Sequence, residues 1–278
     1  MLAARVRALS VALAACAFAG CTVSYSPAPV TVPAPRPQAA VRASIDLSFF
    51  YDDLDPYGDW LWVEPYGWVW APGAVDPFWR PYTVGRWAWS DVGWTWVSEE
   101  NWGWACYHYG RWTRAARHGW VWIPGNVWAP AWVAWRHGPG VVGWAPLPPE
   151  VGFRVGVGLD LGRVDLDVVL RPDWWCFVDA ARVIEPRVVR YAYAVGRNVT
   201  VIHQTTRVVR IEVEHDRVFN RGIDEHEIER QIRRPLPRYR LVDDAARTRH
   251  AELRPGEVRV WRPAVGEAPQ GAAPRRGF

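Results

Sequence analysis

Residues 85–97 decide the fold and read Gly85-Arg86-Trp87-Ala88-Trp89-Ser90-Asp91-Val92-Gly93-Trp94-Thr95-Trp96-Val97. In residues 86–90 and again in residues 94–97, large apolar side chains alternate with small or polar ones, which is the period-two pattern of a β-strand. The link between the two runs is short and contains glycine, as the connection of a hairpin does. The stretch therefore predicts one antiparallel β-hairpin that carries four tryptophans.

The same pattern recurs along the chain. The Gly-Trp pair is found at four positions that lie 24 to 26 residues apart: Gly67-Trp68, Gly93-Trp94, Gly119-Trp120 and Gly143-Trp144. The first three copies are preceded by a Gly-x-Trp motif, and the fourth has Trp132 and Trp135 in its place. An isolated hairpin is only marginally stable in water. We therefore expect four tryptophan-rich hairpins that share a small sheet or a barrel-like core.

Composition divides the chain into five expected parts and predicts a mainly β protein. After the repeats, alternation and capping signals predict a small α+β module with one short helix, which runs from Asp224 to about Arg233 and is stopped by Pro235. Strands are expected in residues 155–170, 238–242 and 257–262, and in a hairpin of residues 198–203 and 207–213 that turns at 204–206. The expected parts are a lipoprotein signal peptide (1–20), a proline-rich tether (21–43), the Trp-rich hairpin domain (44–150), the α+β module (151–262) and a disordered tail (263–278).

The amino terminus has the pattern of an export signal. Arg5 and Arg7 precede an apolar run over residues 8–19, which is the length of a signal-peptide core and shorter than the roughly 20 residues of a membrane-spanning helix. The run ends in Phe18-Ala19-Gly20-Cys21, which resembles the bacterial lipobox, although Phe18 replaces the usual Leu or Val. The resemblance implies cleavage before Cys21 and lipid on that cysteine. The alternative is an ordinary secretory signal with an incidental cysteine.

The residues that follow fit a lipid-anchored envelope protein. Residues 22–42 carry proline at almost every second or third position, a composition that favours extended polyproline conformation and a semi-rigid tether. Several acyl chains on Cys21 would hold the protein on a membrane effectively permanently. Because Thr22 stands where Asp would retain a lipoprotein in the inner membrane, we expect the cell envelope, and in particular the outer membrane.

Charge and composition narrow the class of partner. The chain has 33 arginines, no lysine and a net charge of only +4, without a run of like charges. A nucleic-acid-binding protein needs a clustered basic face, so we do not expect nucleic acid as a partner. Twenty-one of the 278 residues are tryptophan, far above the average of globular proteins.

A family resemblance rests on two further strings. Residues 101–112 read Asn101-Trp102-Gly103-Trp104-Ala105-Cys106-Tyr107-His108-Tyr109-Gly110-Arg111-Trp112, and residues 143–149 read Gly143-Trp144-Ala145-Pro146-Leu147-Pro148-Pro149. Together these strings resemble a Trp-rich family of bacterial envelope proteins known as domain of unknown function 6600, over about residues 51–149. Members typically have Pro where this chain has Cys106. The resemblance implies no activity, substrate or cofactor.

Two cysteines of the mature chain follow the lipidated one. Cys106 and Cys176 would meet an oxidising compartment outside the cytoplasm, where a disulfide can form and persist. Such a bridge would close a long loop and stabilise the fold by about 3 to 4 kcal/mol. The alternative is a pair of buried thiols beside Trp104 and Trp175.

The sequence carries little that points to catalysis. It contains no Gly-x-Ser-x-Gly elbow, no glycine-rich phosphate loop and no His-Glu-x-x-His motif, so we expect no enzyme, catalytic residue or cofactor. His108 could serve as a ligand or proton carrier, but no second His, Cys or carboxylate stands near it at metal-ligand spacing, so a structural role and no metal site are expected.

Two functions from different classes remain. In the first, exposed aromatic rings form a binding surface for a glycan, peptidoglycan or another envelope protein, because flat indoles make platforms for sugars and cations. In the second, the protein is a structural or assembly scaffold that acts only through protein–protein contacts. A row of exposed indoles along a groove favours the first, and dispersal or burial of the rings favours the second. The residues expected at the binding surface are Trp104, Tyr107, His108, Tyr109, Trp128 and Trp132.

Overall fold

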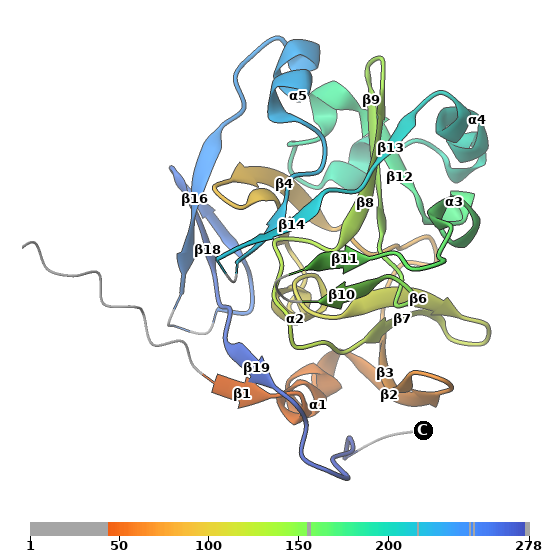
Figure 1. The fold of residues 1–278 in the computed structure, drawn as a ribbon, viewed down its shortest axis with the longest axis vertical. Coiled ribbons are helices and arrows are strands. Elements are labelled where there is room, and N and C mark those ends of the chain that lie inside the picture. The colour runs from red at the N-terminus through yellow and green to blue at the C-terminus, as the bar shows by residue number, and fades with distance from the viewer. Residues whose placement is uncertain (1–43, 155–156, 216, 245, 247, 276–278) are drawn as a thin grey trace, which may run out of the picture. The chain divides into compact units, whose positions relative to one another are not determined.

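The computed structural model describes residues 44–275 except 155–156, 216, 245 and 247 (Figure 1). The expected signal peptide, the tether and Cys21 lie outside the described residues. From Ser44 onward the described chain belongs to one compact unit, and strand pairings cross the division that composition suggested near residue 150. No helix within this part of the chain is both long and apolar enough to cross a membrane.

The mainly β fold and the four predicted hairpins are confirmed. They are β2 (Gly58–Val63) with β3 (Gly67–Pro72), β4 (Gly85–Ser90) with β5 (Gly93–Ser98), β6 (Arg111–Ala115) with β7 (Gly119–Ile123), and β8 (Val133–Gly138) with β9 (Val141–Pro146). In each hairpin a tryptophan lies directly opposite another: Trp60 and Trp70, Trp87 and Trp96, Trp112 and Trp122, Trp135 and Trp144. Cross-strand aromatic pairs of this kind stabilise a hairpin and fix its register.

The four hairpins do not form one sheet or barrel. The first and third join at a single pair, Trp70 of β3 opposite Trp122 of β7, and form a four-stranded sheet. The second lies within a seven-stranded sheet and the fourth at the centre of another four-stranded sheet. The shared core that we predicted therefore lies between three sheets, where the tryptophan faces meet.

Strands from the second half of the chain complete these sheets. Four of these strands pair with the outer edges of the second and fourth hairpins. They are β12 (Cys176–Asp179) on β9, β13 (Thr206–Val208) on β8, β15 (Arg217–Asn220) on β5 and β16 (Arg238–Asp243) on β4. An uncovered edge would leave backbone groups unpaired and open to other chains. The remaining strands are β1 (Ser44–Asp46), β10 (Gly152–Arg154), β11 (Gly158–Asp160), β14 (Ile211–Glu214), β17 (Glu252–Arg254), β18 (Glu257–Val260) and β19 (Ala264–Gly266).

The helix predicted at Asp224 is confirmed, but it is not the only one. It is α5 (Glu225–Ile232), and the Asp224 carboxylate accepts hydrogen bonds from the backbone N–H groups of His226 and Glu227. The structure also contains α1 (Ser48–Leu54), α2 (Gly103–Cys106), α3 (Leu166–Val169) and α4 (Asn198–His203).

The hairpin expected over residues 198–213 is wrong in its first half, because residues 198–203 form α4. Val199 and Val201 would share one face of a strand, but Val199 is 53% exposed whereas Val201 is buried, because residues two positions apart lie on nearly opposite sides of a helix. The Asn198 side chain fixes the start of α4 by donating to the carbonyls of Pro172 and Trp175, at 2.7 and 2.8 Å.

Two further expectations need correction. Residues 155–170, expected as strands, contain β11 and then α3, where the Asp165 carboxylate accepts from the backbone N–H of Asp167 at 2.9 Å. The tail was expected to be disordered from Pro263 onward, but Ala264–Gly266 pairs in parallel with Ser44–Asp46 as β19.

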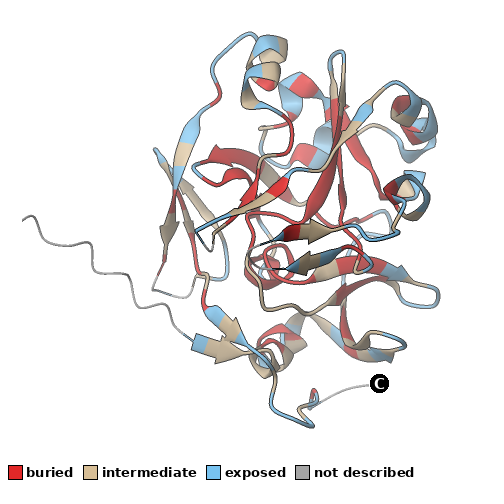
Figure 2. Cartoon of the chain, in the orientation of Figure 1, coloured by how far each residue is buried: buried red, intermediate tan, exposed pale blue. Residues whose placement is uncertain are grey.

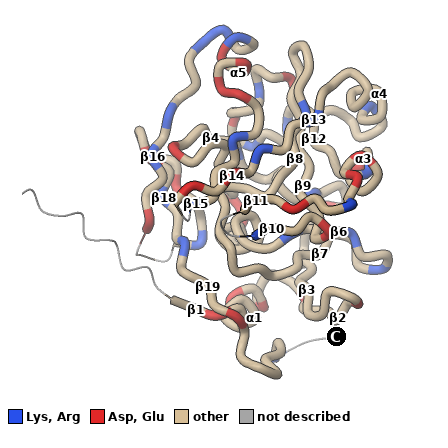
Figure 3. The backbone as a smooth tube through the Cα atoms, in the orientation of Figure 1, with Lys and Arg blue, Asp and Glu red and all other residues tan. Residues whose placement is uncertain are grey.

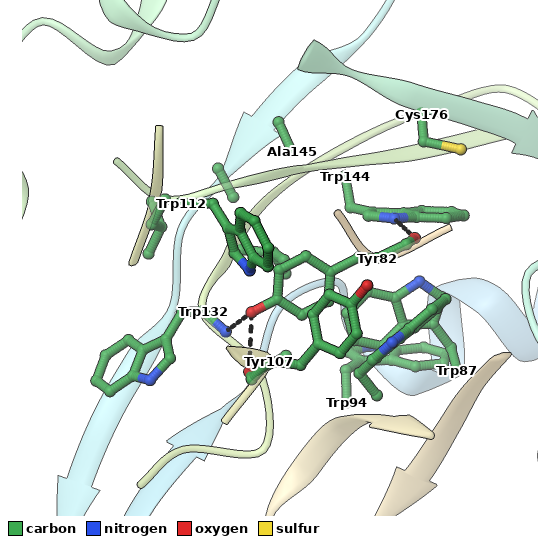
Figure 4. Close-up of a cluster of buried hydrophobic side chains, with 14 of the residues drawn as sticks. Tyr82, Trp87, Trp94, Tyr107, Trp112, Trp132, Trp144, Ala145 and Cys176 are labelled. Atoms are coloured by element: carbon green, nitrogen blue, oxygen red, sulfur yellow. Dashed lines mark hydrogen bonds between the residues drawn. The ribbon is translucent and has the colours of Figure 1, made fainter. Parts of the chain in front are cut away.

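Tryptophan supplies most of the core. Eighteen of the 21 indoles are buried, Trp68 and Trp128 are partly buried, and Trp62 is exposed. Buried residues are concentrated in the strands at the centre of the molecule (Figure 2). Tyr82 and Tyr107 lie among the central rings, where the Tyr82 hydroxyl donates to the Tyr107 carbonyl at 2.9 Å (Figure 4). Many buried indole N–H groups donate to backbone carbonyls, which removes the cost of burying them; examples are Trp70 to Leu54, Trp94 to Ile223, Trp112 to Cys106, Trp122 to Tyr109 and Trp144 to Tyr82.

Candidate functional site

The residues expected at a binding surface lie inside the protein. Trp104, Tyr107, His108, Tyr109 and Trp132 are all buried. The rings of the turn that contains α2 pack against the hairpins instead of facing solvent, as Tyr107 does on Trp96. These five side chains therefore do not form the exposed aromatic surface that we expected.

Hydrogen bonds hold this buried turn in place. The Trp104 indole donates to the Asp53 carboxylate at 3.0 Å, and the Tyr109 hydroxyl donates to the Pro263 carbonyl at 2.7 Å. The Tyr107 hydroxyl donates to the Glu100 carboxylate. Burial raises the pKa of Glu100 to about 7, against which the hydrogen bonds from Tyr107 and Trp79 act in the lowering direction.

His108 has a structural environment. Its Nδ1 donates to the Ala129 carbonyl at 2.9 Å, and its ring stacks on Trp128 at 5.3 Å between centroids. Burial lowers the pKa of His108 to about 4, so the ring is neutral at pH 7. Among the residues that the structure describes, no three His, Cys, Asp or Glu side chains are grouped so as to hold a metal ion.

Of the two alternatives for the cysteines, the structure has the pair of free thiols and not the disulfide. Cys106 in α2 and Cys176 in β12 are both free and buried. Burial is the main cause that raises the pKa of each thiol, to about 11 for Cys176 and well above its usual value for Cys106. The alternative of two buried thiols describes the structure.

One surface feature does combine aromatic rings with charged groups. We define the aromatic cleft as a cavity of about 420 Å³ lined by Phe78, Trp79, Arg80, Arg114, Trp120 and Asp173, among others. Its walls come from the loop that follows β3, the hairpin of β6 and β7, and the short helical turn Pro172–Trp174. The hairpin repeats therefore supply part of this site and the second half of the chain supplies the rest.

The aromatic members of the cleft differ in exposure. Phe78 is 87% exposed, although the Asp76 carboxylate fixes its backbone by accepting from the Phe78 N–H at 2.8 Å. The adjacent Trp79 is buried, and its indole donates to Glu100 at 2.7 Å. A ring of this size held in water on an anchored loop is unusual in a protein that buries most of its aromatic side chains.

Arg80, Arg114 and Asp173 supply charged groups to the lining of the cleft. Arg114 forms an ion pair with Asp173 at 2.8 Å and lies over the Trp120 ring at 5.9 Å. Arg80 is buried, and its Nη1 donates to the Trp175 carbonyl at 2.6 Å, whereas its Nε has no hydrogen-bond partner within the described structure. The cleft can therefore accept an apolar group against the rings and a polar group against the guanidinium ions.

Sequence reasoning missed this cleft. Phe78 lies in Asp76-Pro77-Phe78, within a linker between two hairpins and outside the repeat pattern. The available signal was a large apolar residue in a loop flanked by proline and charge, a position where burial in a strand is not expected. Arg114 and Asp173, which line the same cleft, are 59 residues apart in the sequence, so no local motif indicates that they form an ion pair.

Comparisons with other proteins give one match. No curated protein and no solved structure matches the chain. Residues 51–151 match the model of a family of unknown function, DUF6600, which confirms the resemblance inferred from the tryptophan strings. This stretch spans the four hairpins and α2, whereas the strands that complete the sheets come from outside it. Residues 51–151 are therefore similar to the DUF6600 family of unknown function.

Proposed function

We propose that this protein is a non-enzymatic lipoprotein of the bacterial cell envelope, a scaffold that holds another envelope protein in its aromatic cleft. The observation that carries the proposal is the burial of eighteen of the 21 indoles, which leaves no row of exposed rings for a polysaccharide. The tryptophans then have a structural purpose, because they make a dense core from short hairpins.

The cleft suits a protein segment. Phe78 offers a largely exposed ring, and Val75 and Val195 add partly exposed apolar surface, at 37% and 40%. Interfaces between proteins concentrate binding energy in aromatic and arginine side chains at the centre of a polar rim. Arg80, Arg114 and Trp120 supply side chains of these kinds to the lining of the cleft.

Envelope anchoring is supported by the sequence of the first 43 residues. The basic start, the apolar run and the lipobox-like Phe18-Ala19-Gly20-Cys21 favour cleavage and acylation at Cys21. The proline-rich tether then lets the folded body stand away from the membrane surface. We propose the outer membrane as the anchored membrane.

Photo-crosslinking in living cells tests the cleft. A photoreactive phenylalanine analogue replaces Phe78 in the full-length protein, and the same analogue at Val168, which is 75% exposed on α3, serves as the matched control. We expect a discrete protein adduct from position 78 and none from position 168. Equal adducts at both positions, or none at 78, would contradict the scaffold proposal.

A sedimentation assay decides between a protein and a glycan ligand. The full-length protein and a Phe78→Ala variant are mixed with purified peptidoglycan and with envelope polysaccharide. We expect neither protein to sediment with either material. Retention of the wild type that Phe78→Ala abolishes would assign the cleft to a glycan, which is the first of the two functions that the sequence left open.

Metabolic labelling tests the anchor. We expect labelled palmitate to enter the wild-type protein and not a Cys21→Ser variant. An unlabelled wild-type protein would remove the lipoprotein part of the proposal and leave the cleft untouched.

A further inference from the structure

A second pocket, separate from the aromatic cleft, surrounds a single arginine. It has a volume of about 260 Å³ and lies where β6 begins, β7 ends and β10 passes. Its lining includes Arg111, Ile123, Asn126, Trp132, Val151 and Phe153. Among the described residues no Asp or Glu belongs to the lining, so one positive charge lies among mostly apolar residues.

The guanidinium group of Arg111 is packed but incompletely bonded. Its Cζ lies 3.6 Å from the centroid of the Trp132 ring, and its Nη1 donates to the Gly110 carbonyl at 2.8 Å. Its Nε is buried and has no hydrogen-bond partner among the described residues. Many other arginines of the described chain form ion pairs, for example Arg114 with Asp173 and Arg136 with Asp167. Within the described residues, Arg111 forms no ion pair.

Arg111 is partly buried, and a cation that has lost part of its water without gaining an ion pair is costly. Burial lowers the pKa of Arg111 to about 9, so the group still carries its charge at pH 7. Contact with the Trp132 ring offsets part of the cost. The neighbouring Tyr82 phenol does not supply a counter-charge, because burial raises its pKa and keeps it neutral.

We propose that this pocket binds a carboxylate carried on a small apolar group. The carboxylate accepts from the Arg111 guanidinium, and the apolar group lies against Trp132, Phe153 and Ile123. Arginine suits this role because its planar group meets a carboxylate with two parallel hydrogen bonds.

The surroundings favour one negative charge over two. The Asn126 amide at the pocket donates to the Glu267 carboxylate at 2.7 Å, which places an acidic side chain close to the entrance. Glu267 opposes an entering anion, and Arg111 is the one cation in the lining. A phosphate dianion is therefore a poorer match than a monocarboxylate. The carboxylate could come from the C-terminus of a peptide or from a free organic acid, and both sources share the same chemistry.

Isothermal titration of the full-length protein tests the site. The probe is 3-phenylpropionate, and 3-phenylpropanamide is its uncharged counterpart. We expect the carboxylate to bind the wild type at least tenfold more tightly than the amide, and Arg111→Gln to lose at least tenfold of that affinity. Arg86→Gln is the matched control, since Arg86 follows the glycine of the second hairpin as Arg111 follows that of the third. It should bind as the wild type does.

Thermal unfolding guards against a misfolded variant. Removal of an unpaired buried charge should leave the melting temperature of Arg111→Gln equal to or above that of the wild type, so its loss of binding cannot be attributed to unfolding. The proposal is overturned if the wild type binds no carboxylate, if Arg111→Gln binds as well as the wild type, or if inorganic phosphate binds more tightly than 3-phenylpropionate.

A peptide arm separates the two sources. Acetyl-Ala-Ala-Phe with a free C-terminal carboxylate is compared with the same peptide as its C-terminal amide. Tighter binding of the free-carboxylate peptide than of 3-phenylpropionate assigns the pocket to a protein C-terminus. Tighter binding of 3-phenylpropionate assigns it to a small organic acid. Either result supports the carboxylate site.

Discussion

The rings of Trp87 and Trp135 lie 4.5 Å apart between centroids, and this contact joins the second hairpin to the fourth. The two residues belong to different sheets, so their contact is one of those that turn separate hairpins into a common core. The Trp135 indole also donates to the Asn220 side chain at 3.1 Å, which links the repeat to a strand from the second half of the chain.

Truncation of Trp135 should therefore be severe. We expect Trp135→Ala to lower the free energy of unfolding by about 3–5 kcal/mol, because it leaves a large cavity and unpairs the Asn220 amide oxygen. Trp62→Ala is the control, since Trp62 is 55% exposed, and it should cost less than about 1 kcal/mol. Urea unfolding followed by circular dichroism measures both. Equal losses would mean that the tryptophans do not share a core.

Two turn glycines separate a backbone requirement from a packing requirement. Gly93 and Gly119 occupy the same repeat position, with φ of 88° and 71°. A Cβ on Gly93 would lie 2.0 Å from the Asn220 carbonyl oxygen, whereas a Cβ on Gly119 would meet nothing within 4 Å.

We expect Gly119→Ala to cost about 1–2 kcal/mol for the left-handed backbone alone. Gly93→Ala should add a further penalty of about 1–3 kcal/mol, because β15 must move away from β5. Chemical denaturation of the two variants measures the difference. Similar costs would show that β15 does not pack on β5 as described.

Glu100 should make stability fall as pH rises. Its pKa is raised by burial from 4.5 to about 7, so the folded protein holds a proton that the unfolded chain releases between these values. The contribution is fully present below pH 4.5 and is lost by about pH 7, and it amounts to about 3 kcal/mol. In a Glu100→Gln variant this loss should disappear when unfolding is measured across that range.

His108 should act in the opposite direction. Its pKa is lowered by burial from 6.5 to about 4, so between these pH values the unfolded chain binds a proton and the folded protein does not. Stability from this group is present above pH 6.5 and is lost as the pH falls toward 4, again by about 3 kcal/mol.

The wild type should consequently show a nearly flat stability between pH 4.5 and 6.5, where the two effects oppose each other. Glu100→Gln should show stability that rises with pH, and His108→Gln should show stability that falls. Parallel pH profiles for the two variants would contradict the burial of one group or both.

Alkylation tests whether Cys106 and Cys176 are free thiols or form a disulfide. We expect Cys106 and Cys176 to resist alkylation at pH 8 in the folded protein, because both are buried and their pKa values are raised. Both should react after unfolding without a reducing agent, as counted by mass spectrometry. Alkylation that needs prior reduction would restore the bridge.

The repeat pattern predicted the hairpins correctly because the information is local. Alternation around Trp87 and Trp96 sets two strand faces, and Gly93 allows the tight turn between them. The Asp224 cap of α5 is local in the same sense. The prediction for residues 198–203 was wrong because their valines occur in helices as well as in strands. The helix is held in place by long-range hydrogen bonds from the Asn198 side chain, which no local pattern reveals.

The prediction of an exposed aromatic surface was wrong for a different reason. The sequence shows that Trp104 and Tyr107 are aromatic, but their exposure is decided by what packs over them. Here Phe50 packs on Trp104 and Trp96 on Tyr107. Phe78 lies in a linker beside proline and charge, but only the folded structure shows that it is 87% exposed.

By itself, the sequence determined a tryptophan-rich set of hairpins, the capped helix at Asp224 and the family of residues 51–151. Only the tertiary structure decided that the hairpins divide among three sheets and that distant strands cover their edges. It alone set the exposure of Phe78 and the missing counter-charge of Arg111. The physical reason is that turn and strand preferences act between neighbours along the chain, whereas burial and charge pairing depend on residues that meet only after folding.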